Sequence, residues 1–286
     1  MLGPILLAIG IPIVLSGVLL AAGWAGLRRN SARQLPWWSI AGAAALGYAG
    51  GHISLSGWPP LPPGDVTHWL PFVAVFAFLC AAIVSIRGTP VYVWSMRVVI
   101  AATVAALLSF PLFKSQSAGS ALASAAILFG VQLLWLVDHD VLARRFPPVE
   151  FIVVLLILSV GVSVALVLSR TALLGQLAGA MYAALGPLLM ASIFLPKRNL
   201  VLTPLAFVVV PVLVGLVFLG MEFAYLPRTP ALLLILAPTV LAAISRSRAA
   251  DQPKWRWAGI ALLALVIAGA LFAITRALPA LELYEI

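Results

Sequence analysis

The chain has 286 residues, of which 64% are hydrophobic and 9% are charged. A soluble domain carries roughly 25% charged residues, and a chain with so few charges cannot cover the surface of a water-soluble globule. The net charge is +9, but the basic residues cluster between long apolar stretches, as in loops that face anionic lipid. We therefore expect the lipid bilayer as the surrounding partner, and no nucleic acid.

The first apolar stretch, residues 4–25, is expected to remain as a membrane-spanning helix. No Lys or Arg precedes it, whereas a secretory signal peptide begins with a positively charged region. Its positive charges, Arg28, Arg29 and Arg33, come after it instead.

Ten stretches of membrane-crossing length follow one another along the chain. About 20 apolar residues cross the hydrocarbon layer as a helix, and backbone groups cannot stay unpaired in lipid. The sequence therefore predicts an all-α polytopic transmembrane helix bundle of about ten helices, in a single integral membrane domain over residues 1–286. The expected helices are residues 4–27, 37–55, 69–86, 96–113, 119–137, 150–169, 173–195, 200–225, 229–244 and 257–275. The fourth is short and begins beside Arg97, and the ninth is short and contains Pro238, so full spanning is in question for these two.

The charges of the connecting loops predict an orientation. With the N-terminus outside and the helices alternating in direction, 13 of the 17 Lys and Arg residues fall on the inner side. The four on the outer side are Lys114, Arg170, Arg228 and Arg276. Because Lys and Arg favour the cytoplasmic side, we expect a protein of the plasma or inner membrane with both termini outside.

The nine tryptophans give an independent signal. All of them fall near the ends of the expected helices, including Trp135 at the end of the fifth. Tryptophan favours the headgroup layer because its ring is apolar while its N–H needs a partner. The positions of the tryptophans therefore favour the same set of spans.

Ten helices also permit an inverted repeat of five plus five, with halves at residues 1–140 and 141–286. The tetrad Ala-Ala-Leu-Gly occurs at residues 44–47 and again at residues 183–186, in helices that such a repeat would relate. Chance recurrence in Ala- and Gly-rich helices is the alternative explanation. In helix number and length alone, the layout resembles the drug/metabolite transporter group, which implies a carrier. Those proteins usually begin inside the cell, opposite to the orientation expected here.

Two helices carry faces of small residues, which let helix backbones approach closely in lipid. The first is Ala43, Gly47 and Gly51, and the second runs along residues 117–124. We expect both faces to be buried against other helices.

The loop over residues 56–68 is the most distinctive candidate site. Four prolines stiffen it, and His52, Asp65 and His68 lie before and within it. Two imidazoles and a carboxylate can bind a metal or relay a proton, although their spacing matches no known ligand pattern. The structural alternative is that Asp65 caps the start of the third helix.

Three further polar residues fall within or beside apolar stretches. Glu222 is a functional candidate because an ionisable group at membrane depth is costly; at a helix end it would instead be an interfacial residue paired with Arg228. Gln132 and Gln176 are expected to form hydrogen bonds between helices.

The segment Asp138-His139-Asp140, followed by Arg144 and Arg145, is expected to be a solvated inner loop. It resembles half of the paired aspartate motif of prenyl-transfer enzymes, and no second half is present. The motifs of zinc peptidases, P-loop nucleotide-binding proteins and serine hydrolases are also missing from the sequence. We therefore assign no catalytic residue, metal or cofactor.

Three functions fit these features. The first is a transporter or permease-like carrier of a small neutral or lipophilic molecule, favoured by ten spans, proline-containing helices and few buried charges. The second is a non-catalytic structural or assembly subunit that binds other membrane subunits. The third is a membrane-embedded enzyme, which requires His52, Asp65, His68 and Glu222 to converge at the outer surface.

Overall fold

The computed structural model describes residues 2–29, 34–195, 200–247 and 251–282. This part of the chain contains ten long α-helices, one short α-helix, one 3₁₀ turn and no strands, which confirms the all-α bundle. The long helices are α1 (Leu2–Arg29), α2 (Trp37–Ser56), α3 (Leu70–Arg87), α4 (Pro90–Ser109), α6 (Ala118–Arg145), α7 (Pro148–Leu168), α8 (Ala172–Phe194), α9 (Thr203–Phe223), α10 (Arg228–Ser245) and α11 (Pro253–Glu282). The short elements are η1 (Val66–Trp69) and α5 (Leu112–Ser115).

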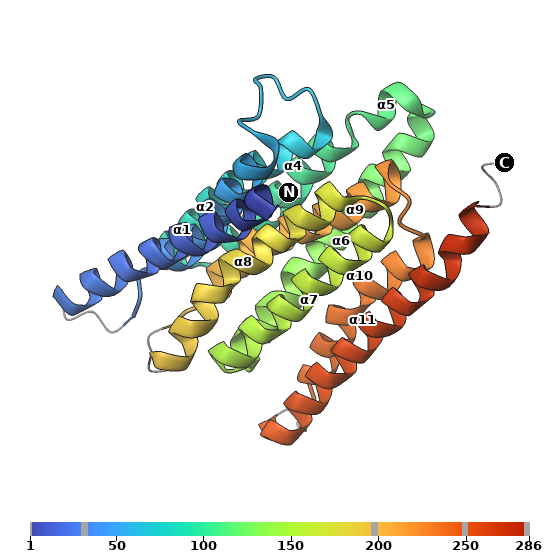
Figure 1. The fold of residues 1–286 in the computed structure, drawn as a ribbon. Coiled ribbons are helices and arrows are strands. Elements are labelled where there is room, and N and C mark those ends of the chain that lie inside the picture. The colour runs from blue at the N-terminus through green and yellow to red at the C-terminus, as the bar shows by residue number, and fades with distance from the viewer. Residues whose placement is uncertain (1, 30–33, 196–199, 248–250, 283–286) are drawn as a thin grey trace.

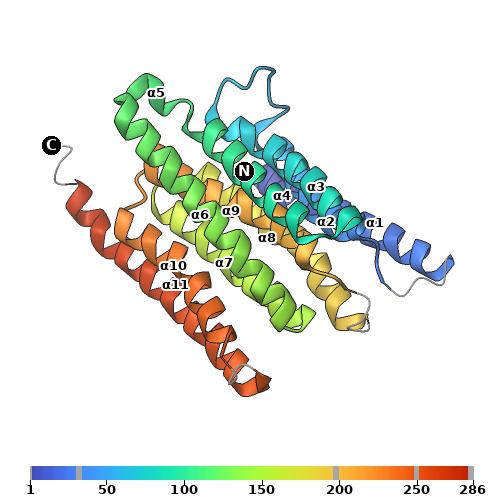
Figure 2. The same ribbon diagram turned by 180° about the vertical axis from the view of Figure 1, so that it is seen from behind.

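The long helices lie side by side and alternate in direction (Figures 1 and 2). One end of the bundle carries the start of α1, the loop over residues 57–65, α5 and the end of α11; we call it the α5 face. The opposite end carries Arg87, Arg145 and Arg246, and we call it the arginine face. The two ends of the described chain thus lie on the same side, as an even number of crossings requires.

Within the described residues, nine of the ten long helices are long and apolar enough to cross a membrane. The tenth, α2, has a full 20 residues, but nine of them are Ala or Gly. It lies against α1, α3, α8 and α9. Because other helices surround it, its side chains need not be as apolar as those of a helix that faces lipid. The chain is an integral membrane protein.

Helix α9 forms the centre of the bundle. Residues 204–220 are all buried, without a break, and the helix contacts α2, α3, α4, α6 and α7. A helix that is apolar on every side is expected in such a position.

The small-residue face of α2 packs as expected. Ala43, Gly47 and Gly51 are buried, and a Cβ at Gly51 would lie 2.7 Å from the Cβ of Ala180 in α8. A Cβ at Gly47 would lie 2.9 Å from that of Ala184. The two Ala-Ala-Leu-Gly tetrads therefore meet where α2 crosses α8, and the inverted repeat remains a prediction.

The second small-residue face, on α6, is not buried, so that prediction was wrong. Ser117, Gly119, Ser120 and Ala123 are exposed, and a Cβ at Gly119 would meet nothing within 4 Å. The reason is that α10 packs on the later turns of α6 and leaves its first turns open to a cleft.

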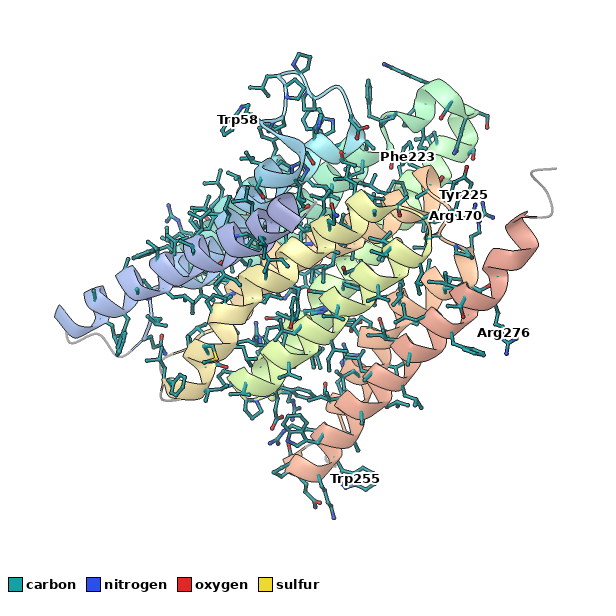
Figure 3. All side chains as sticks on the ribbon, in the orientation of Figure 1. Trp58, Arg170, Phe223, Tyr225, Trp255 and Arg276 are labelled. Atoms are coloured by element: carbon teal, nitrogen blue, oxygen red, sulfur yellow. The ribbon has the colours of Figure 1, made fainter. Side chains whose placement is uncertain are left out.

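Helix α6 is also longer than expected, because it continues to Arg145. Asp138, His139 and Asp140 are helical and buried, so the expected solvated loop was wrong. The two aspartates can lie inside the bundle because Arg246 pairs with Asp138 and Arg97 pairs with Asp140. The same extension places Trp135 far from a helix end, fully buried. Other aromatic residues do mark the two ends, such as Trp58 and Trp255 in Figure 3.

Candidate functional site

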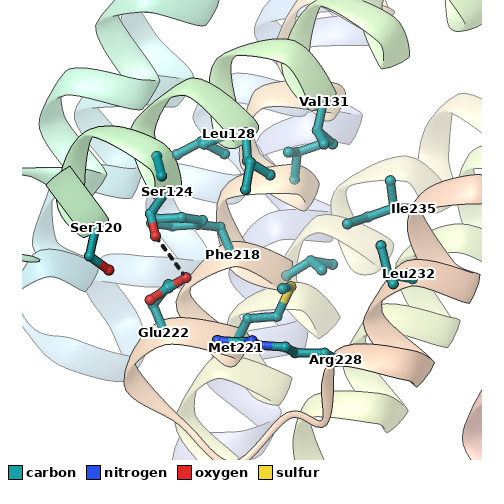
Figure 4. Close-up of a pocket in the computed structure, with 14 residues that line it drawn as sticks. Ser120, Ser124, Leu128, Val131, Phe218, Met221, Glu222, Arg228, Leu232 and Ile235 are labelled. Atoms are coloured by element: carbon teal, nitrogen blue, oxygen red, sulfur yellow. Dashed lines mark hydrogen bonds between the residues drawn. The ribbon is translucent and has the colours of Figure 1, made fainter.

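A cleft of about 390 Å³ lies between α6, α9 and α10, in the half of the bundle nearer the α5 face (Figure 4). Its apolar walls include residues from all three helices: Ile127, Leu128, Val131, Val214, Val217, Phe218, Met221, Leu232 and Ile235. Ile127 and Leu232 are 63% and 52% exposed. The cleft therefore opens between α6 and α10 towards the exterior.

The sequence of α6 explains why space remains there. Its first turns carry Ser120, Ala123 and Ser124 where they face the cleft, and such short side chains cannot reach the branched residues of α10. One and three turns later, the large Leu128 and Trp135 are fully or almost fully buried. The two helices are therefore in contact near mid-membrane and apart near the α5 face.

Two hydrogen bonds close the floor of the cleft. Gln132 of α6 donates its side-chain N–H to the carbonyl oxygen of Pro211 in α9, at 3.2 Å. Trp135 donates its indole N–H to the carbonyl oxygen of Ile235 in α10, at 2.8 Å. Pro238 has no N–H to donate to Leu234, so α10 lacks one backbone hydrogen bond in the same turn. Gln132 thus forms the interhelical bond expected of it.

Glu222 lies at the mouth of the cleft, one residue before α9 ends. It is half-buried. The Ser124 hydroxyl donates to one carboxylate oxygen at 3.2 Å, and the Gln116 side-chain amide donates to the other at 3.4 Å. The Ser120 hydroxyl in turn donates to the side-chain oxygen Oε1 of Gln116 at 3.0 Å. The carboxylate is held at the cleft by neutral donors.

Arg228, the first residue of α10, lines the other side of the mouth. Its side chain extends towards Met221 and Glu222 (Figure 4). The described residues form no ion pair between Glu222 and Arg228 within 4.0 Å, so the pairing expected between them is not made. A negative and a positive group therefore stand separately at one opening.

The loop candidates are only partly brought together. The rings of His52 and His68 lie edge to face with centroids 6.4 Å apart. The fully buried His52 places Nε2 3.0 Å from the carbonyl oxygen of Thr67, a contact in which the imidazole is the donor. Asp65 instead caps η1, because its carboxylate accepts from the N–H and hydroxyl of Thr67, both at 2.7 Å. The capping role considered for Asp65 is confirmed, with a 3₁₀ turn leading into α3.

The four polar residues that a membrane-embedded enzyme would require at the outer surface do not form a single site. Glu222 bonds to Gln116 and Ser124, not to either histidine. Across the described ranges, no three His, Cys, Asp or Glu side chains are grouped closely enough to hold a metal ion. Gln176 of α8 is half-buried, and its side chain makes no hydrogen bond to another described residue, so the prediction of an interhelical bond at this position was wrong. These positions provide no assembled catalytic constellation.

The arginine face holds an ion-pair network that the sequence did not reveal. Arg97 of α4 lies 2.7 Å from Asp140 of α6. Arg246, the residue that follows α10, lies 3.2 Å from Asp138, whose side chain is 1% exposed. The sequence did contain one indication of these pairs. Two acidic residues lie beside one apolar stretch, and arginines of opposite charge lie at the ends of other stretches.

Two further ion pairs fasten the hairpin of α10 and α11 to the bundle on this face. Arg256 of α11 binds both carboxylate oxygens of Glu150 in α7, at 2.7 and 3.3 Å. Arg145 of α6 lies 3.6 Å from Asp251, which precedes α11. With the Arg246–Asp138 pair, these contacts join the hairpin to α6 and α7 at the end opposite the cleft.

Comparison of the chain with models of protein families, with curated proteins and with solved structures finds no match.

Proposed function

We propose that this protein is a membrane carrier that binds a small lipophilic or amphipathic molecule in the cleft between α6, α9 and α10. The observation that carries the proposal is a one-sided cleft of about 390 Å³ with apolar walls and a polar mouth. Ligand sites in proteins are typically clefts of about 300–1,000 Å³ that are mostly apolar and contain a few placed polar groups. The exposed lining of α6 and α10 gives the ligand a lateral path from the surrounding lipid.

The hairpin of α10 and α11 is the element that would move. It joins α6 at the Trp135–Ile235 bond and at the ion pairs of the arginine face, while α10 stands away from α6 at the cleft. Rocking of the hairpin about mid-membrane would close the cleft on the α5 face and loosen the contacts below it. Movement of one bundle against another around a fixed site is a common means of alternating access.

Photolabelling tests the binding step. The protein in lipid nanodiscs is irradiated with a single-chain phospholipid that bears a diazirine in its acyl chain, and labelled peptides are mapped by mass spectrometry. Label is expected in residues 120–131 and 228–235. Ala123→Trp fills the cleft and should abolish this labelling. Ala126→Trp is the matched control, because Ala126 is exposed on the same helix and does not line the cleft.

Transport is measured with a fluorescent single-chain phospholipid in proteoliposomes. A reductant added outside quenches the lipid of the outer leaflet at once, and it quenches the lipid of the inner leaflet only as that lipid crosses the bilayer. A carrier accelerates the rate of this crossing, and Ala123→Trp should return it to that of protein-free vesicles while Ala126→Trp should not. Label spread evenly over the lipid-facing helices, or equal rates with and without protein, would overturn the proposal.

A second candidate function, that of a subunit in a larger membrane complex, is favoured by the exposed small residues of α6. Gly119, Ala123, Ala126 and Gly130 leave a smooth stripe on which another helix could pack closely. Native mass spectrometry after gentle extraction distinguishes the two functions. A larger assembly that Gly130→Leu disrupts supports the subunit, whereas a monomer that retains cleft labelling supports the carrier.

A further inference from the structure

The mouth of the cleft presents two opposite charges that do not neutralise each other. Glu222 lies in the last turn of α9 and Arg228 is the first residue of α10, and both line the same cavity. Their side chains approach one another in Figure 4, yet the ion pairs of the described residues do not include them as a pair. A ligand that fits here meets a carboxylate and a guanidinium together.

Glu222 still has capacity to bind a cation. Its two hydrogen bonds come from a hydroxyl and an amide, at 3.2 and 3.4 Å, and both donors are neutral. A carboxylate has about four acceptor positions, so two remain for a ligand. These two donors fix the direction of the carboxylate without cancelling its charge.

Arg228 is exposed, and within the described part of the chain it has no hydrogen-bond or ion-pair partner. A guanidinium presents five donors in a planar fork that matches a phosphate or carboxylate group. Its companion at the mouth is therefore expected to be an anion that arrives with the ligand.

From this pairing we propose that the cleft takes a single-chain zwitterionic amphiphile, whose cationic group lies at Glu222 and whose anionic group lies at Arg228. The apolar walls formed by Ile127, Leu232 and Ile235 receive its hydrocarbon chain. The source is membrane lipid, because the cleft opens between α6 and α10 towards the lipid-facing surface and not only at the α5 face. This inference rests on the proposed binding function and adds the class of head group to it.

The two charges should make the cleft select against amphiphiles of other charge types. A purely anionic head group would meet Arg228 but would place negative charge beside Glu222. A purely cationic one would bind Glu222 and face Arg228. Neutral amphiphiles would leave both charges partly desolvated and without an opposite charge beside them.

Native mass spectrometry in a non-ionic detergent tests the proposal with three amphiphiles of equal chain length. They are lysophosphatidylethanolamine as the zwitterion, lysophosphatidylglycerol as the anion and an alkyltrimethylammonium as the cation. The wild-type protein is expected to bind the zwitterion about tenfold more tightly than either singly charged compound, as one well-formed charge-assisted contact implies.

Glu222→Gln should remove the preference over the anion, and Arg228→Gln should remove the preference over the cation. Arg276→Gln is the matched control, since Arg276 lies on α11 outside the cleft, and it should change neither preference.

The outcomes separate the two proposals. Binding that Ala123→Trp abolishes but that is equal for all three head groups overturns the zwitterion and leaves the carrier intact. Binding that Ala123→Trp does not affect, or no binding of any amphiphile, overturns both. Preferences that Glu222→Gln and Arg228→Gln each remove in the stated direction support the zwitterion.

Discussion

Trp135 of α6 donates its indole N–H to the main-chain carbonyl oxygen of Ile235 in α10, across 2.8 Å. The bond lies where the two helices meet below the cleft, and the indole ring is fully buried. It is the contact that divides the interface between α6 and α10 into an open half and a closed half.

Trp135→Phe is expected to lower the free energy of unfolding by about 1 kcal/mol, because the ring is largely retained while one hydrogen bond is lost. Thermal melting in detergent measures the change. Trp255→Phe serves as control, since Trp255 is half-exposed at the start of α11 and should melt like the wild type. An equal loss in both variants would contradict a special role for the Ile235 contact.

Arg246→Gln is expected to destabilise the protein by about 2 kcal/mol, because it leaves the buried carboxylate of Asp138 without its cation. The figure is below that of a fully buried pair since the Arg246 side chain is 50% exposed. The double variant Asp138→Asn with Arg246→Gln should recover part of the loss. Arg144→Gln should cost little, because its partner Asp140 keeps Arg97 at 2.7 Å. A double variant less stable than Arg246→Gln alone would contradict the orphaned-charge explanation.

Gly51→Ala is expected to destabilise the bundle by about 1–2 kcal/mol. The added Cβ would lie 2.7 Å from both the Ala180 Cβ and the Pro12 Cγ, and overpacking of this kind outweighs the gain of about 1 kcal/mol that Ala brings to a helix. Gly130→Ala has nothing within 4 Å of the new Cβ and should be neutral or slightly stabilising. Melting temperatures of the two variants and the wild type check the sign of each effect. A Gly51→Ala variant at least as stable as the wild type would show that close approach of α2 and α8 is not required.

Asp65→Ala is expected to loosen the start of α3, with a local cost of about 1 kcal/mol for a lost helix cap. The amide of Thr67 donates to the Asp65 carboxylate and that of His68 to the Asp65 carbonyl oxygen. Hydrogen exchange of residues 66–69 should therefore accelerate, most strongly at Thr67. Leu61→Ala, at a 75% exposed position of the same loop, should leave the exchange unchanged. Faster exchange in Leu61→Ala alone would show that loop packing, not the cap, protects these amides.

Both termini are expected on the outer side of the membrane, from the excess of Lys and Arg on the opposite loops. Reporter fusions measure this: a reporter active only outside the cytoplasm should be active at the C-terminus and inactive when inserted at Gly88, between α3 and α4. The reverse pattern would invert the assignment while leaving the two chain ends on one side.

Of the candidate site, the sequence pointed to Glu222 and Gln132 because a polar group in an apolar stretch is conspicuous. It did not point to Arg228 as a cleft residue, since an arginine between two spans is ordinary. It placed Asp138 and Asp140 in solvent because the arginines that pair with them, Arg246 and Arg97, are distant in the chain. Polar residues are thus identifiable one at a time, whereas their pairing depends on contacts between helices.

The amino-acid sequence by itself determined the bilayer as solvent, the ten helices and the arrangement of both chain ends on one side, because each follows from the length and apolarity of a local stretch. Only the tertiary structure decided that α9 lies at the centre, that Gly47 meets Ala184 and that α6 and α10 part to leave a cleft. In water, a helix shows its buried face by an apolar stripe; in lipid, the buried and the exposed faces are both apolar. Which face packs against which is therefore set by the three-dimensional fit of small and large side chains.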